Sequence, residues 1–122
     1  MRNVSTPTLL LSICAIGLIL AVGAAWWMGR TSILVVNASE RELWSLEVKF
    51  PGRTCRYEAV APQAEVLCEG RADRDGDVEV SYRFDEGGEL GVFSTEYVNP
   101  TLGWQGSMVL RPDGTIDVTR AR

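Results

Sequence analysis

Hydrophobic and polar positions divide the chain into two parts with different periodicities. From Leu9 to Met28 no residue is charged and almost every side chain is apolar. A helix over these 20 residues would be about 30 Å long, which is the thickness of the hydrocarbon core of a bilayer. After residue 30, apolar and polar residues alternate with a period of two, a pattern typical of half-buried strands. The pattern predicts a membrane anchor at residues 1–30 and a β domain at residues 31–122.

The alternating part predicts seven or eight short strands. Turns rich in Gly, Pro, Asn and Asp separate them roughly every ten residues. We expect Trp44 to lie on the same buried face as Leu46 and Val48. The predicted fold is all-β, a small antiparallel β-sandwich of the immunoglobulin-like type, with a β-barrel as the alternative. The expected strands cover residues 32–37, 44–50, 53–60, 65–69, 78–84, 90–98, 104–110 and 115–119.

The flanks of the apolar segment favour an uncleaved signal-anchor. Trp26 and Trp27 lie at its far end, where indole rings prefer the lipid–water interface. Arg2 and Arg30 flank it on either side, so the charge bias is small, and the predicted orientation with the β domain outside the cytoplasm depends partly on the cysteines. The alternative is a signal peptide that is cleaved near residues 23–25 and releases a secreted β domain.

Small residues recur every four positions in the apolar segment, at Gly17, Ala21 and Ala25. Such a face allows two helices to approach closely, so these residues are candidates for helix packing. The alternative is that Gly and Ala are simply common in membrane helices.

Two cysteines of the β domain, Cys55 and Cys68, are predicted to form a disulfide. If residues 60–63 form a hairpin loop, Cys55 faces Cys68 and Tyr57 faces Val66 on one side of that hairpin. A structural disulfide places the domain in an oxidising compartment outside the cytoplasm. Cys14 stays unpaired in the apolar segment.

Composition excludes several classes of function. The chain has no histidine, which removes the commonest general base and the imidazole ligands of most zinc and copper sites. Residues 31–122 hold 10 Lys and Arg against 16 Asp and Glu, a net charge of −6, which disfavours nucleic acid and anionic lipid headgroups as partners. We expect no catalytic residues and no cofactor, and we expect that the protein is not an enzyme.

Acidic residues alternate at Asp73, Asp75 and Asp77, and such oxygen clusters are candidates for a calcium site. The spacing departs from that of an EF-hand loop, and Arg74 lies among the carboxylates. A solvated turn is the plainer interpretation, so we expect no metal.

The loop at residues 97–104 places large apolar side chains around a bend made by Pro100 and Gly103. Rigid aromatic residues on loops are typical of binding hot spots. Tyr97, Leu102 and Trp104 are therefore candidate contacts to a protein partner. The alternative is that Tyr97 and Trp104 fold back over one end of the core.

The segments ILVVNAS, LWSLEVKFPG, DVEVSYRF and STEYVNPTLGWQG follow one another along the chain. In this order they resemble small bacterial single-pass envelope proteins with one N-terminal membrane helix and an immunoglobulin-like β domain. The resemblance implies a fold and a topology, and it carries over no functional residues. The expected function is a membrane-anchored protein-binding module, an accessory or adaptor subunit at the cell envelope. The alternative is an extracytoplasmic domain that senses a ligand or an ion such as calcium.

Overall fold

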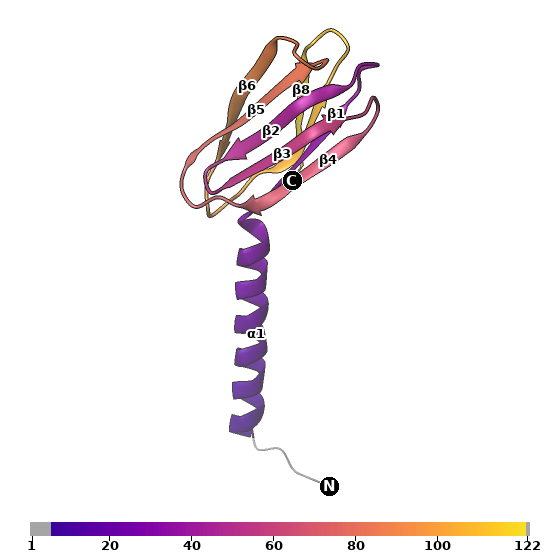
Figure 1. The fold of residues 1–122 in the computed structure, drawn as a ribbon. Helices are drawn as coiled ribbons and strands as arrows, with labels where there is room; N and C mark the ends of the chain where they lie inside the picture. The colour runs from indigo at the N-terminus through magenta and orange to yellow at the C-terminus, as the bar shows by residue number, and fades with distance from the viewer. Residues whose placement is uncertain (1–5, 122) are drawn as a thin grey trace.

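The computed structural model describes residues 6–121 as one long helix joined to a domain of eight strands (Figure 1). The predicted order of elements is confirmed, and most strand ends lie within two residues of their predicted positions. The elements are α1 (Thr6–Met28), β1 (Arg30–Asn37), β2 (Leu43–Phe50), β3 (Arg53–Val60), β4 (Glu65–Arg71), β5 (Gly76–Phe84), β6 (Leu90–Val98), β7 (Gln105–Leu110) and β8 (Ile116–Arg120).

The strands form two four-stranded sheets that pack face to face (Figure 1). Sheet A has the order β4-β1-β7-β8, and sheet B has the order β3-β2-β5-β6. Sheet B is antiparallel throughout, but β1 and β7 pair in parallel in sheet A. The expectation of a wholly antiparallel sandwich is therefore wrong at this pair, because β1 and β7 both start at the end of the domain next to α1.

Alternation along the strands builds the core between the sheets. In β1 every second residue from Thr31 to Asn37 is buried, and the residues between them face outward. In sheet B, Val48 and Val80 are paired neighbours that point into the same core. Apolar side chains from all strands of the two sheets contribute, so the domain has a single core.

Trp44 does not lie on the buried face that the alternation predicts. The register between β2 and β5 shifts between Trp44 and Glu47, and Ser45 has a left-handed backbone with φ of 51°. This β-bulge inserts one extra residue, so Trp44 and Leu46 face opposite sides of sheet B. Trp44 is half-buried on the outer face, and Leu46 is buried in the core.

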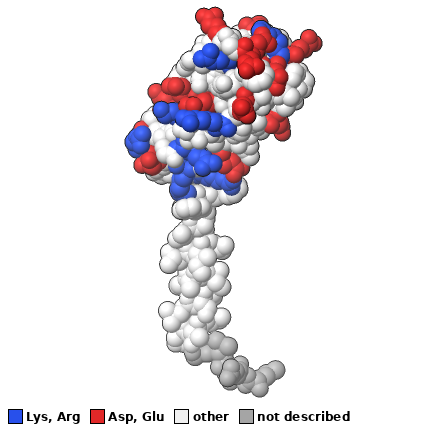
Figure 2. Space-filling view, viewed as in Figure 1, with Lys and Arg blue, Asp and Glu red and all other residues white. Residues whose placement is uncertain are grey.

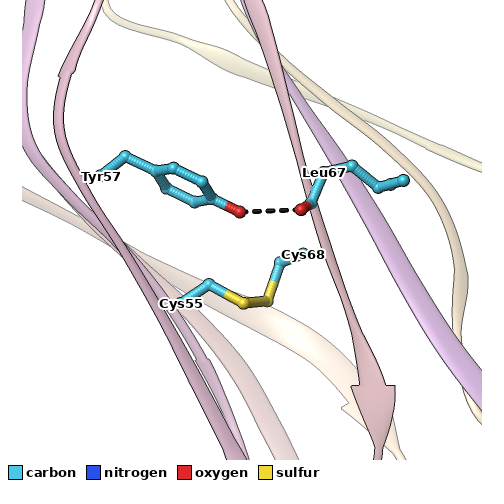
Figure 3. Close-up of a disulfide and its surroundings, with 4 residues drawn as sticks. All are labelled: Cys55, Tyr57, Leu67 and Cys68. Atoms are coloured by element: carbon cyan, nitrogen blue, oxygen red, sulfur yellow. Dashed lines mark hydrogen bonds between the residues drawn. A yellow bond between two sulfur atoms is a disulfide. The ribbon is translucent and has the colours of Figure 1, made fainter.

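The predicted disulfide is present between Cys55 and Cys68, with the two Cα atoms 5.9 Å apart (Figure 3). The predicted hairpin is wrong, because β3 bonds to β2 and β4 bonds to β1. The disulfide therefore joins the edges of sheet B and sheet A rather than two strands of one hairpin. Beside it, the Tyr57 hydroxyl donates a hydrogen bond of 2.8 Å to the Leu67 carbonyl, which adds a second link between the same edges (Figure 3).

The helix α1 is long and apolar enough to cross a membrane. The most apolar 18-residue stretch within residues 7–28 has a mean hydropathy of 2.5, and none of it is buried against the rest of the described chain. A signal sequence near the N-terminus has the same length and apolar composition.

Candidate functional site

The three predicted contact residues of the 97–104 loop have different surroundings. Tyr97 and Leu102 are exposed, at 52% and 60%, whereas Trp104 is 1% exposed. The indole N–H of Trp104 donates to a Glu96 carboxylate oxygen at 3.1 Å, and its ring belongs to the core. Trp104 is thus removed from the candidate contact surface, because its large ring fills the space between the sheets next to α1.

The loop lies at the end of the sandwich that joins α1. The Asn99 side-chain oxygen accepts hydrogen bonds from the backbone N–H groups of Thr101 and Leu102, at 3.0 and 2.7 Å. Gly103 has φ of 63°, and a Cβ there would overlap the Arg30 carbonyl at the start of β1. The loop is therefore held in one shape against the junction between helix and domain.

The alternating carboxylates do not gather into a metal site. Asp73 pairs with Arg74 at 2.9 Å, and Asp77 belongs to β5. A hydrogen bond between Asp75 and the Tyr97 hydroxyl, followed by desolvation and the nearby carboxylate charge, raises the pKa of Tyr97. Within residues 6–121 no group of three or more potential metal ligands comes together.

Two of the three small-residue positions of α1 are exposed in the part of the chain that the structure describes. Gly17 and Ala21 are exposed, and nothing lies within 4 Å of a Cβ built at Gly17. The side chain of Ala25 lies outside the described residues. Helix packing through this face stays a prediction.

The outer face of sheet B is charged. Glu47 accepts a hydrogen bond from Arg56 at 3.1 Å across β2 and β3. Lys49 and Glu79 are a cross-strand pair of β2 and β5 on the same face. Figure 2 shows blue and red side chains spread over this side of the domain. Such a face is well solvated, and its apolar side chains include the half-buried Trp44 of β2 and the exposed Leu90 and Val92 of the edge strand β6.

The outer face of sheet A carries an apolar patch instead. Leu34 of β1 is paired with Leu67 of β4, and Val36 of β1 is paired with Val109 of β7. All four side chains point away from the core because their neighbours Val35, Cys68 and Met108 point into it. Leu67 is 48% exposed, and the other three are half-buried by their neighbours. We call this set the sheet A patch: Leu34, Val36, Leu67 and Val109.

The sequence carries a signal for this patch that alternation alone does not use. The run Ile33-Leu34-Val35-Val36 is apolar at every position, whereas a strand with one solvated face alternates. A continuous apolar run is typical of a strand that is covered on both faces. In the described chain β1 is covered on its inner face only.

Charge is also distributed unevenly along the long axis of the domain. The loops at the end far from α1 hold six acidic residues and two arginines, namely Glu40, Arg41, Glu42, Asp85, Glu86, Glu89, Arg111 and Asp113. On the side shown in Figure 2, Lys and Arg side chains gather just above the end of α1. The excess negative charge of the domain therefore lies mainly at the end away from the helix.

Asn37 is a structural centre that sequence reasoning missed. It is fully buried, and its side-chain nitrogen donates to the Arg41 and Val60 carbonyls at 2.8 and 3.2 Å. Its side-chain oxygen accepts a hydrogen bond from the Ser39 hydroxyl at 2.6 Å. These bonds tie the turn after β1 to the end of β3, so Asn37 acts in folding.

Comparisons with known proteins assign no family to the chain. No protein-family profile and no curated protein matches its sequence. A solved NMR structure of a protein from Eubacterium rectale is similar over 77% of this chain and 90% of that one, with 12% identity and a TM-score of 0.49. At this identity the likeness assigns neither a family nor a function.

Proposed function

We propose that the protein is a membrane-anchored module whose β domain binds another protein at the cell envelope through the sheet A patch. The observation that carries this proposal is the patch itself, on a sheet whose central strand β1 is apolar on both faces. The domain has one core and a disulfide, and neither feature requires apolar side chains on an outer face.

The exposure of α1 supports the proposed anchor. An apolar helix of 23 residues, whose most apolar stretch is not buried against the described part of the chain, needs another apolar environment. A bilayer provides it, and the two tryptophans at the end of the helix suit the interface. The immunoglobulin-like class and the orientation outside the cytoplasm belong to the same proposal, and the disulfide supports the orientation.

The position of the patch suits a partner in the same membrane. Leu34 lies four residues and Val36 six residues beyond Arg30 in β1, which is up to about 13–20 Å above the end of the helix at strand rise. Anchoring confines the domain to the membrane plane and raises its effective concentration for such a partner. The mechanism is passive: the helix places the domain, and the patch makes the contact.

A matched pair of variants tests the contact. In full-length tagged protein purified from mild-detergent membranes, Leu34→Thr with Val109→Thr removes apolar surface from the sheet A patch. Leu90→Thr with Val92→Thr removes similar surface from β6 of sheet B, where both residues are exposed. Threonine is β-branched and is favoured in strands, so both variants should keep their strands.

We expect the sheet A variant to lose a stoichiometric partner that the wild type and the β6 variant retain. Loss in the β6 variant alone would place the contact at the edge of sheet B. Retention in both variants would refute binding through the patch, and a partner that is a second copy of the chain would refute the adaptor role. The mass of the purified protein separately decides between an anchor and a cleaved signal peptide.

A further inference from the structure

The junction between α1 and β1 contains a single residue, Gly29. The Arg71 guanidinium, from the end of β4, donates to the Trp26 carbonyl at 2.7 Å and lies 4.1 Å from the Trp26 ring centre. It therefore satisfies one of the carbonyls that the last helical turn leaves without a partner. The Arg30 guanidinium likewise lies over the ring of Trp27, 5.0 Å from its centre.

Space at the junction is filled from both sides. A Cβ at Gly29 would lie 2.5 Å from the Arg71 guanidinium and 2.6 Å from the Pro100 carbonyl. The end of the helix is thus held between β4 and the 99–103 loop, with no flexible linker. The domain cannot move away from the end of the helix without breaking these contacts.

This geometry fixes the depth of the domain if α1 spans a bilayer. The candidate span Pro7–Met28 has 22 residues, which gives a length of about 33 Å against a hydrocarbon core of about 30 Å. Met28 then lies at the edge of the hydrocarbon, and the headgroup layer extends about 5–8 Å beyond it. The residues at the base of the sandwich must lie inside that layer.

A hollow of about 450 Å³ opens at this depth, between the last turn of α1 and the ends of β7 and β8. Trp27, Met28 and Leu102 give it an apolar lower wall, and Gln105 and Arg120 give it polar groups above. Arg120 is exposed and makes no ion pair within the described part of the chain. Apolar contacts below a guanidinium match the acyl–glycerol–phosphate order of a phospholipid.

We infer that this hollow, which we call the base hollow, binds a phospholipid headgroup. The Arg120 guanidinium binds the phosphate, and the Leu102 side chain inserts at the acyl boundary. The inference rests on the proposed membrane span. Most of the excess negative charge lies in loops at the opposite end, and the acidic residues of the 72–75 loop at the base, Asp73 and Asp75, do not line the hollow. A seated base would hold the domain at one angle and keep the sheet A patch at a constant height.

The test places an environment-sensitive fluorescent label at one position at a time in full-length Cys14→Ser protein. The protein is reconstituted in vesicles of phosphatidylcholine with phosphatidylglycerol, and the disulfide is kept oxidised. Leu102→Cys reports the base, Ile16→Cys reports the middle of α1, and Glu86→Cys reports the far loops. Quenching by aqueous iodide and by lipid-attached spin labels is measured for each.

The label at residue 102 should be quenched by shallow lipid-attached spin labels and protected from iodide, while the label at residue 86 should be quenched by iodide alone. Arg120→Gln should increase iodide quenching at residue 102 several-fold, and Arg111→Gln, at the far end, should not. A buried label at residue 16 with an iodide-accessible label at residue 102 would overturn the inference and leave the anchor intact. Iodide access at residue 16 would refute the span and the inference together.

Discussion

Sheet A and sheet B bury their inner faces in one core but present different outer faces. The outer face of sheet B carries charged cross-strand pairs such as Glu47 with Arg56 on its central strands, and its exposed Leu90 and Val92 lie on the edge strand β6. The same face of sheet A carries Leu34 beside Leu67 and Val36 beside Val109. Folding needs the inner faces alone, so an apolar outer face costs solubility without adding to the core. The difference between the sheets therefore points to a function for sheet A.

Both sheets depend on the shared core, and Trp104 is the largest buried side chain in that core. Trp104→Ala should lower the free energy of unfolding by about 3–5 kcal/mol, because it leaves a cavity and removes the partner of Glu96. Urea unfolding of the detergent-solubilised protein, followed by circular dichroism, measures the change. Trp104→Phe is the control and should lower the free energy of unfolding by less. Equal losses in the two variants would show that the volume of the ring does not determine the stability at this position.

The Cys55–Cys68 disulfide also holds the edges of the two sheets together. Replacing both cysteines with serine should destabilise the domain by about 3 kcal/mol, because a closed loop of this length restricts the unfolded chain. The urea midpoint measures the loss, and Cys14→Ser should leave that midpoint unchanged. A double serine variant as stable as the wild type would mean that the edges of β3 and β4 need no covalent link.

Val35 and Val36 are neighbours in β1 that face opposite sides of sheet A. Substituting each in turn therefore tests the inner and outer faces separately. Val35→Thr places a hydroxyl in the core and should cost about 1–3 kcal/mol of stability. Val36→Thr changes an outward-facing position and should alter stability by no more than about 0.5 kcal/mol. Thermal unfolding compares the two variants. Equal destabilisation would show that the outer face of sheet A belongs to the fold rather than to an interface.

The smallest expected effect is on pH dependence, through two tyrosines that reach from sheet B toward sheet A. The Tyr57 hydroxyl donates to the Leu67 carbonyl, and the Tyr82 hydroxyl donates to the Gly114 carbonyl at 3.4 Å. Burial raises the pKa of both hydroxyls above the ordinary value of 10.0.

Because the folded pKa values are raised, the protonated hydroxyls of Tyr57 and Tyr82 make their full contribution to stability below pH 10.0. It is lost as the pH rises above that value through the folded pKa values. The urea midpoint of Cys14→Ser protein should therefore fall as the pH is raised above 10.0. The fall should be smaller once Tyr57→Phe and Tyr82→Phe are added, and an unchanged slope would assign the alkaline loss to other groups.

Local sequence patterns predict where the strands of this fold lie better than they predict which strands pair. Alternation of apolar residues locates the strands, because it records which side chains face the core. It does not record which strands pair, so the hairpin expected around Cys55 and Cys68 is instead a crossing between sheets. The bulge at Ser45 also reverses the face of Trp44, and no local pattern marks a single inserted residue.

The candidate contacts are harder to predict from the sequence than the strands. A loop with Tyr97, Leu102 and Trp104 has the composition of a binding loop, but the size of Trp104 makes it a core residue once β7 is placed. Leu102 lies beside α1, which depends on the pairing of β1 with β7. The sheet A patch depends on three strands that are distant in sequence, and only the run Ile33–Val36 hints at it.

Site-specific photo-crosslinking in intact membranes tests the central claim most directly. A benzophenone amino acid is placed at Leu67 in the sheet A patch and, as the control, at Val92 on β6; these side chains are 48% and 58% exposed. The proposed function predicts one dominant adduct to a different membrane-associated protein from position 67, lost with Leu34→Thr, and no such adduct from position 92. Equal crosslinking from both positions, or adducts from position 92 alone, would contradict binding through the outer face of sheet A.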